Sequence, residues 1–390
     1  MLGILAINIA GFAGPPAEVY GPVTRGSTDP ATDAAIYALW LVLFEGKMRA
    51  LFSLLFGASM ELFVSRAEET GRDGQPLQLR RLLWLAVFGY LHWLLWWGDI
   101  LFSYAAAGVA ALALRQAPRK LLFAGGLAIF ALWQVNGMLG ELPLAMAESH
   151  VAAGTASGAE AATLRDAKAA SDAAVVRKTA ETRQGLVAQV TEKVANRSLD
   201  PLWNAWTEVG EALPYMLIGI ALLRGGFFSG GLRGIWLVII AGTGLVMGGA
   251  PTFAFARWAW ASGYPYAAMR LAIDHALGFP HLLMALGYAA LLVLAAPRLL
   301  TTFPGRLLAA AGRMAFSNYI GTTLVMTTLF YGWGLGLVGK VGTTGQVGYV
   351  VFGWTLMLGW SNLWLRWFRQ GPLEWLWRSL VEGRKLPLRR

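Results

Sequence analysis

Long apolar runs alternate with short polar segments along most of this chain, and the alternation predicts membrane-spanning helices. A helix needs roughly 20 apolar residues to cross the ~30 Å hydrocarbon core of a bilayer. Runs near that length lie around residues 47–65, 82–97, 100–115, 120–141, 208–223, 233–251, 277–296, 313–333 and 346–366. With the opening segment, they predict an all-α transmembrane helix bundle of about ten spans.

The opening segment is shorter than the other apolar runs. Leu2–Ala13 offers about 12 apolar residues before Pro15 and Pro16, which is too few to span a bilayer. No basic residue precedes it, so it lacks the positive charge of a signal peptide. We therefore expect this sequence to begin partway through its first span.

One long polar segment interrupts the apolar pattern. Residues 145–206 are rich in Ala and carry balanced charge, which favours helices outside the membrane. A solvated structural insertion explains this composition, and a catalytic role is the alternative. Four parts are therefore predicted: the first five spans in 1–144, the extracytoplasmic insertion in 145–206, the remaining spans in 207–368 and a basic cytoplasmic tail in 369–390.

Composition agrees with a multi-pass membrane protein and orients it. The 390 residues are 56% hydrophobic and only 14% charged, and no cysteine is present to form disulfides or act as a nucleophile. A cytoplasmic N-terminus places 19 of the 32 Lys and Arg residues on the inner side, which predicts that both termini are cytoplasmic. Because this topology accounts for the net charge of +10, we expect no nucleic-acid partner.

Five strings along the chain resemble those of a known family. They are FEGKMRALFSLLFGAS (44–59), WGDILFSYAAAG (97–108), GRMAFSNY (312–319), FYGWGLGLVGK (330–340) and GPLEWLWRSLVEGRKLPLRR (371–390). Together they resemble the YeiB-like family of bacterial inner-membrane proteins, defined by domain of unknown function 418. The chain lacks that family's Leu-Asp and Arg-Gly signature in the first helix and has a larger insertion. The resemblance implies a multi-pass protein of the bacterial cytoplasmic membrane.

That family is similar in layout to the transmembrane acyltransferase superfamily, which includes heparan-alpha-glucosaminide N-acetyltransferase. The similarity implies that a cytoplasmic acyl-CoA, such as acetyl-CoA, donates an acyl group to a sugar, lipid or small metabolite on the outer side. Asn8 falls where the acetyltransferase carries a functional Asn. The catalytic His that follows there has no counterpart here, since no His occurs between Asn8 and Leu91.

Polar residues in the predicted spans gather at the outer ends. Each would lack a partner if it faced lipid, so an outward-facing polar cavity explains their placement. The residues at this level are Asn8, Glu45, Lys47, Arg49, His92, Asp99, Asn136, Glu141, Asp274, His275 and His281. The set predicted to bind substrate is Asn8, Lys47, Arg49, Asn136, Asp274, His275 and His281.

Acyl transfer requires a base near the acceptor and donors for the developing oxyanion. His92 is the predicted base, and Asp99 or Glu45 would orient it as the other catalytic residues. Glu45 and Arg49 are four residues apart and share one helix face, while Lys47 points roughly the opposite way. A structural ion pair of Glu45 with Arg49, and a core histidine at position 92, are the alternative interpretations.

Basic and polar residues at the inner ends suit the phosphates of coenzyme A. Arg313, Ser317 and Asn318 begin the ninth predicted span and are the candidate donor-binding residues. The positive-inside rule alone also explains the basic ones. No metal is expected. A transporter of a small solute and a scaffolding membrane protein stay open as functions, and so does a homodimer.

Overall fold

The computed structural model describes residues 1–24 and 26–390, and these form helices almost throughout. The elements are α1 (Leu2–Ala13), η1 (Pro16–Tyr20), α2 (Pro30–Leu43), α3 (Lys47–Glu69), α4 (Gly74–Leu95), α5 (Leu101–Leu114), α6 (Arg119–Ala153), α7 (Gly158–Thr182), α8 (Leu186–Asn196), α9 (Asp200–Arg224), α10 (Gly234–Ala261), α11 (Tyr266–Leu271), η2 (Ala272–Ala276), α12 (Gly278–Leu299), α13 (Phe303–Arg313), α14 (Ala315–Phe330), α15 (Thr343–Trp364) and α16 (Pro372–Glu382). In these described ranges, β pairing is limited to an isolated bridge between Phe368 and Arg389.

The all-helical class predicted from the sequence is confirmed, since every predicted apolar run overlaps a helix. In the part of the chain that the structure describes, four helices are long and apolar enough to cross a membrane: α6, α9, α10 and α12. The helices α1 and α5 are apolar but shorter, with 12 and 14 residues. The chain is therefore a helical membrane protein, and the total of about ten spans stays a prediction.

Glycines allow the central helices to approach closely. Helix α9 packs against α3, α5 and α6, and α10 packs against α12. A Cβ added at Gly57 of α3 would lie 2.2 Å from the carbonyl oxygen of Met216 in α9. One added at Gly244 of α10 would lie 2.5 Å from the carbonyl oxygen of Leu283 in α12. Such backbone contact is how small residues hold membrane helices together, as the Gly244-x-x-x-Gly248 spacing predicts.

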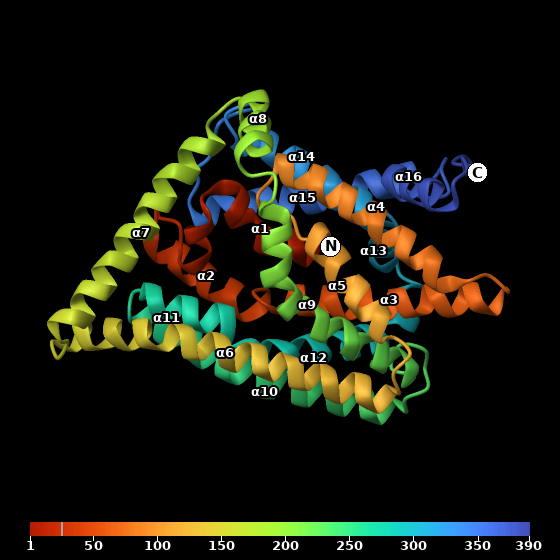
Figure 1. Ribbon diagram of the computed structural model, residues 1–390, viewed down its shortest axis with the longest axis horizontal. Coiled ribbons are helices and arrows are strands. Elements are labelled where there is room, and N and C mark those ends of the chain that lie inside the picture. The colour runs from red at the N-terminus through yellow and green to blue at the C-terminus, as the bar shows by residue number, and fades with distance from the viewer. Residues whose placement is uncertain (25) are drawn as a thin grey trace.

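The helices form a roughly triangular frame (Figure 1). Helices α6 and α12 run along one side, α4 and α14 along another, and α7 along the third. The short helix α1 lies inside the frame and packs against α14, α15 and α3. The C-terminal helix α16 packs on α4 and α14.

The segment predicted as an insertion consists of α7 and α8, and its two ends continue into α6 and α9. Near the middle of α7, the Lys168 ammonium lies 3.4 Å from a carboxylate oxygen of Glu148 in α6. At the C-terminal end of α7, the backbone N–H of Gly332, between α14 and α15, donates to the Thr182 carbonyl at 2.9 Å. Helix α7 is thus attached on both sides of the frame.

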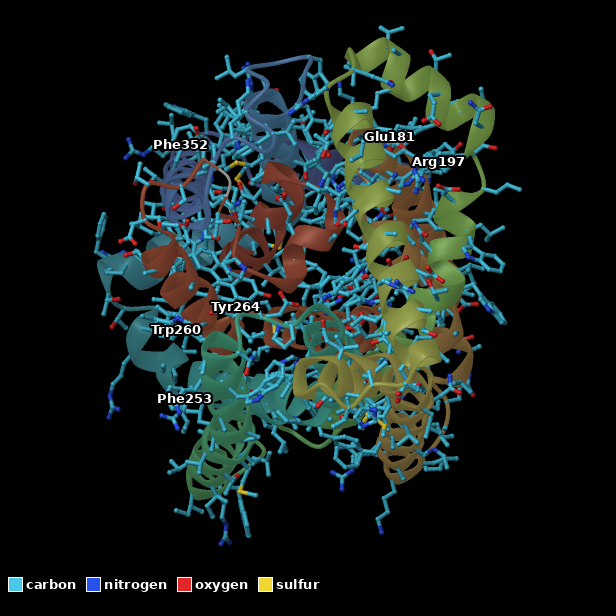
Figure 2. The ribbon with its side chains drawn as sticks, turned by 90° about the vertical axis from the view of Figure 1, so that its left-hand side faces the viewer. Glu181, Arg197, Phe253, Trp260, Tyr264 and Phe352 are labelled. Carbon is cyan, nitrogen blue, oxygen red and sulfur yellow. The ribbon has the colours of Figure 1, made fainter. Side chains whose placement is uncertain are left out.

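Ion pairs fold the end of the insertion back onto itself. Figure 2 shows Glu181 and Arg197 close together where α7 meets α8, and their side chains are 3.2 Å apart. Arg197 also pairs with Asp200 at 2.6 Å, at the first residue of α9.

A buried ion network joins three helices at the end predicted to face the cytoplasm. The Glu61 carboxylate in α3 accepts from Arg115 Nε at 2.7 Å and from Arg224 Nε at 2.8 Å. Arg115 follows α5, and Arg224 ends α9. The Glu61 side chain is only 6% exposed, so these arginines replace the water it would otherwise bind.

The Glu61→Ala substitution is expected to lower the free energy of unfolding by about 3 kcal/mol, because it leaves two arginines without this buried partner. Chemical denaturation in detergent micelles followed by circular dichroism would measure it. Glu69→Ala, at an exposed position of the same helix, is the control and should change stability by about 0.5 kcal/mol or less. Equal effects of the two substitutions would contradict this role of Glu61.

Candidate functional site

Three side chains from distant segments form a buried hydrogen-bonded row, here called the His92 cluster: Asp99, His92 and Thr323. His92 Nδ1 lies 2.6 Å from Asp99 Oδ1, and His92 Nε2 lies 2.8 Å from Thr323 Oγ1. The side chains of His92 and Asp99 are 0% and 2% exposed. The carboxylate favours the tautomer that carries its proton on Nδ1, which leaves the Nε2 lone pair toward the Thr323 hydroxyl.

Local structure explains how His92 and Asp99 meet. Helix α4 ends at Leu95, directly after His92, and the chain turns before α5 begins at Leu101. Asp99 lies in this turn, and its second oxygen accepts the backbone N–H of Phe102 at 3.0 Å. His92 and Asp99, seven residues apart, therefore meet across a helix end and not along one helix face.

The insertion fixes the same end of α4. Lys193 of α8 is 5% exposed, and its ammonium donates to the carbonyl of Trp93 at 2.6 Å and to that of Leu94 at 3.2 Å. Carbonyls at a helix C-terminus have no partner within the helix, so a cation satisfies them well. Lys193 thus holds the helix turn that carries His92.

A small cavity adjoins the His92 cluster. It is lined by Met1, Ile4, Leu5, Asn8, Phe12, Tyr319, Thr322, Thr323 and Met357. Its volume of about 10 Å³ is close to that of one water molecule. Asn8 contributes an amide, and the buried Tyr319 hydroxyl interacts with the Ile100 backbone but donates to no partner among the described residues. The Tyr319 ring also packs on the His92 ring, with centroids 4.9 Å apart.

A second group, here called the outer charged cluster, contains Glu45, Arg49 and Glu211. Arg49 lies 3.4 Å from the Glu45 carboxylate and 3.5 Å from the Glu211 carboxylate. The predicted i,i+4 pair within one segment is therefore present, and Glu211 of α9 completes it. All three side chains are between 19% and 34% exposed, so they are accessible to solvent or to a polar ligand.

Further polar pairs come from the segment before α12. The Tyr20 hydroxyl donates to the Asp274 carboxylate at 3.0 Å, and Arg270 lies 2.7 Å from Glu141. The charge of Arg49 acts on Asp274, which connects this segment to the outer charged cluster. His275 turns instead toward α6, with Nδ1 3.2 Å from Gln134 Oε1.

Burial raises the pKa of Asp274 to about 6, and the negative charge of Glu141 acts in the same direction. The folded protein therefore binds this proton more tightly than the unfolded chain. The stabilisation is complete below about pH 4 and is lost as the pH rises through 6. The unfolding free energy of the wild type should fall on the order of 3 kcal/mol between pH 4 and 7. Asp274→Asn should not show this fall.

Melting curves in detergent between pH 4 and 7 would measure this difference. Asp172→Asn, at an exposed position of α7, is the matched control and should follow the wild type. The interpretation fails if Asp274→Asn and the wild type lose stability in parallel.

Three other predicted substrate-binding residues form no hydrogen bond or ion pair with either cluster. Lys47 is fully buried, and its ammonium donates to the carbonyl of Leu41 at 2.6 Å. The charge of Glu45 acts on Lys47, and the charges of Lys47 and Arg49 act on His281, so both lie near the outer charged cluster. His281 is 3% exposed and packs against the backbone of Gly46. Asn136 is exposed on α6.

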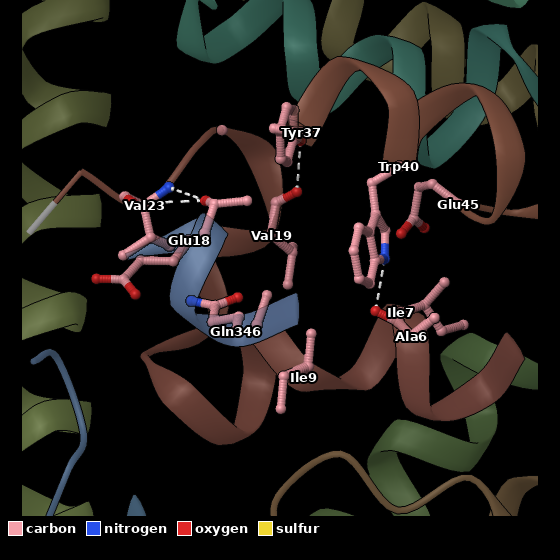
Figure 3. A pocket seen from close by; sticks show the side chains of 13 residues that line it. Ala6, Ile7, Ile9, Glu18, Val19, Val23, Tyr37, Trp40, Glu45 and Gln346 are labelled. Atoms are coloured by element: carbon pink, nitrogen blue, oxygen red, sulfur yellow. Dashed lines mark hydrogen bonds between the residues drawn. The ribbon is translucent and has the colours of Figure 1, made fainter. Parts of the chain in front are cut away.

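A larger cavity, of about 40 Å³, lies across α1 from the one beside Asn8. Figure 3 shows its aromatic wall, where the Glu45 carboxylate lies beside the Trp40 ring. Trp40 Nε1 donates to the Ala6 carbonyl at 2.6 Å, and the Tyr37 hydroxyl donates to the Val19 carbonyl at 2.7 Å. Ala6, Ile7 and Ala10 face this cavity, whereas Ile4, Leu5 and Asn8 face the other. Helix α1 therefore separates two cavities, each lined mainly by apolar side chains with a few polar groups.

The candidate donor-binding residues lie at the N-terminus of α14, where they contact α16. Glu374 accepts the backbone N–H groups of Phe316 at 2.7 Å and Ser317 at 3.1 Å, and also the Ser317 hydroxyl. The Asn318 amide donates to Ser361 Oγ at 2.9 Å. Arg313 is exposed and donates to the Arg369 carbonyl. Two of the strings that resemble the family, around Ser317 and Glu374, are thus in direct contact.

Sequence reasoning missed Tyr20, Glu211, Tyr319 and Thr323. Glu211 carried a usable signal, since a carboxylate within an apolar run requires a partner just as Glu45 does. Thr323 carried no such signal in the sequence. It is 231 residues from His92 in the chain, and a threonine in an apolar helix usually bonds to its own backbone.

Comparisons with known proteins assign the chain to a family. The profile of a family described as "Protein of unknown function (DUF418)" matches residues 222–384. The uncharacterized protein YeiB of Escherichia coli K12 is 32% identical over 394 residues, which cover 98% of this chain and 93% of YeiB. This chain belongs to the DUF418 family.

Other relatives match over a similar length. The uncharacterized protein YxaH of Bacillus subtilis 168 is 29% identical over 97% of this DUF418 chain and 90% of its own length. An uncharacterized 39.9 kDa protein in the amylase 3′ region of Bacillus acidopullulyticus is 24% identical over 100% of this chain and 92% of its own. No solved structure matches the chain. The family resemblance inferred from the five strings is therefore confirmed over the whole length.

Proposed function

We propose that this DUF418 protein is a membrane acyltransferase of the bacterial inner membrane, with both termini in the cytoplasm. It would move a small acyl group from a cytoplasmic acyl-CoA to a hydroxyl or amine acceptor on the outer side. The observation that carries this proposal is the His92 cluster, in which a carboxylate, an imidazole and a hydroxyl follow one another at 2.6 and 2.8 Å beside a polar cavity.

His92 is the general base of this proposal. Asp99 holds the ring in the tautomer that presents a lone pair at Nε2, and a positioned base of this kind contributes typically 10²–10⁴-fold to a rate. Water is excluded from the cluster, which strengthens each of its electrostatic interactions. Both ring nitrogens of a buried histidine need a partner, and Asp99 and Thr323 supply them; the cavity that Thr323 lines is what favours catalysis over a purely structural histidine.

Asn8 supports the same assignment. In the resemblance to acyltransferases, Asn8 corresponds to a functional Asn, but the His that follows it there is missing from this part of the chain. The cavity beside Asn8 is lined by Thr323, the partner of His92. We infer that α4 supplies the base that α1 lacks.

Two donors in the same cavity suit a developing oxyanion. Tyr319 and Asn8 both line the cavity, and the Tyr319 hydroxyl, which interacts with the Ile100 backbone, donates to no partner among the described residues. Preorganised donors in a dry site are often the largest single contribution to acyl transfer. Tyr319 and Asn8 are therefore the proposed oxyanion donors.

The donor is proposed to bind at the start of α14. A helix N-terminus favours an anion, and Glu374 occupies that position here. A phosphate of the acyl-CoA would displace the Glu374 carboxylate and pair with the exposed Arg313. Thr323 lies eight residues after Ala315 along α14, or ~12 Å, a distance that the pantetheine arm of coenzyme A can cover.

The deciding experiment measures acetyl-CoA binding and turnover by the purified protein in lipid nanodiscs. We expect acetyl-CoA to bind, and Arg313→Ala to weaken binding about tenfold through loss of a charge-assisted contact. Arg233→Ala, a surface substitution at the start of α10, is the control for net charge. Absence of both binding and thiol release would reject the proposal.

Transport of a small solute is the second candidate. The outer charged cluster favours it, since Glu45, Arg49 and Glu211 are partly exposed charges within a membrane protein. Substrate-dependent flux in liposomes, without consumption of acetyl-CoA, would support transport over transfer.

A further inference from the structure

We propose that Thr323 is a covalent acyl carrier, so that the reaction proceeds in two steps through an acyl-threonine ester. This inference rests on the proposed acyl transfer and adds a catalytic residue to it. Thr323 is 1% exposed, lines the cavity beside Asn8, and places its hydroxyl 2.8 Å from His92 Nε2. A nucleophile, a base and an orienting carboxylate in this order are the arrangement that activates a hydroxyl.

The hydrogen bond between Thr323 and His92 differs from the bonds that neighbouring threonines of α14 make. Thr327 and Thr328 donate to carbonyls four residues earlier, both at 2.7 Å. The corresponding distance from Thr323 Oγ1 to the carbonyl of Tyr319 is 3.3 Å. The hydroxyl of Thr323 is thus within reach of both the Tyr319 carbonyl and the imidazole, and its shorter contact is to the imidazole.

The chemistry balances without any further co-reactant. Thr323 Oγ attacks the thioester carbonyl carbon while His92 Nε2 takes the hydroxyl proton. The new C–O bond forms, the C–S bond breaks, and His92 returns the proton to the thiolate, which releases the coenzyme A thiol. An acceptor hydroxyl or amine then attacks the ester carbon, and its proton passes through His92 to Thr323 Oγ as the C–O bond breaks.

The surroundings suit an ester intermediate. The cavity is close to the volume of one water molecule, so any acyl group on Thr323 must be small, and even acetyl requires the lining side chains to shift. Its other walls include Leu5, Phe12 and Met357, which keep bulk water from the ester. Asn8 and Tyr319 line the same cavity as Thr323 and are the residues proposed to donate to the carbonyl oxygen in both steps.

The test uses radiolabelled acetyl-CoA and the purified full-length protein, without any acceptor. After denaturation and removal of free label, peptide mass spectrometry locates the acetyl group. We expect wild type and Thr323→Ser to carry it at position 323, and Thr323→Val to lose at least 90% of the bound label. Thr328→Val, the same substitution at an exposed position of the same helix, is the control for folding and should retain the label.

His92→Gln should also prevent labelling while Thr323 is still present. Thiol release with no acetyl group at position 323 would overturn the covalent carrier and leave direct transfer, as proposed above, intact. Absence of any reaction or binding with acetyl-CoA would overturn both. Label that persists in Thr323→Val at another residue would likewise reject Thr323 as the carrier.

Discussion

His92→Gln is expected to slow acetyl transfer on the order of 10³-fold. Unlike an imidazole, a glutamine amide cannot take up the proton of the acceptor group or of the Thr323 hydroxyl. The binding of acetyl-CoA should change little, since His92 contacts Asp99 and Thr323 but none of the candidate donor-binding residues. The rate of coenzyme A thiol release in nanodiscs, at saturating acetyl-CoA, would measure the effect.

Two further variants make this result specific to the base. His150→Gln alters the insertion, where His150 bonds Glu160 at 2.7 Å far from the His92 cluster, and should leave the rate unchanged. Asp99→Asn keeps the shape of the cluster but favours the wrong tautomer, so it should slow the reaction and change its pH profile. A rate in His92→Gln above half that of the wild type would remove His92 from the role of base.

Gly46→Ala is expected to destabilise the protein by about 3 kcal/mol or more. Gly46 has φ of +72°, a conformation that L residues adopt only with strain, and a Cβ there would lie 1.9 Å from His281 Nδ1. The ring of His281 is buried and cannot move freely. Denaturation in detergent micelles would report the loss of unfolding free energy.

Gly71→Ala is the matched control, because Gly71 has φ of +75° but no atom within 4 Å of an added Cβ. It should cost only about 1 kcal/mol, from backbone strain alone. The double variant Gly46→Ala with His281→Ala should recover part of the loss relative to His281→Ala alone. Equal costs at the two glycines would show that His281 does not restrict this turn.

The helices could be predicted from the sequence because long apolar runs in a membrane must satisfy their own backbone. Helix α2 was missed although its N-terminus carried a signal: Asp29 accepts the backbone N–H groups of Ala31 and Thr32, and Pro30 follows it. A search for helix N-cap residues as well as apolar runs would have predicted α2.

The candidate site could be predicted only where its partners are close in the chain. Glu45 with Arg49 and His92 with Asp99 are four and seven residues apart, and both pairs form. Thr323 meets His92 only because α14 packs against α4, and Glu211 meets Arg49 through the packing of α9 on α3. No local sequence pattern specifies such contacts, so Thr323 and Glu211 could be identified only from the structure.

Helix α7 also fixes the distance between the end of α6 and the loop after α14. Its 25 residues extend ~37 Å. Lys168, near the middle of the helix, pairs with α6, and Thr182, its last residue, bonds to Gly332 about 21 Å further on. Because each helical turn adds about 5.4 Å, the number of turns in α7 determines how far the loop after α14 stands from the end of α6. The insertion therefore acts as a spacer of fixed length between the side of the frame that contains α6 and the side that carries the loop after α14.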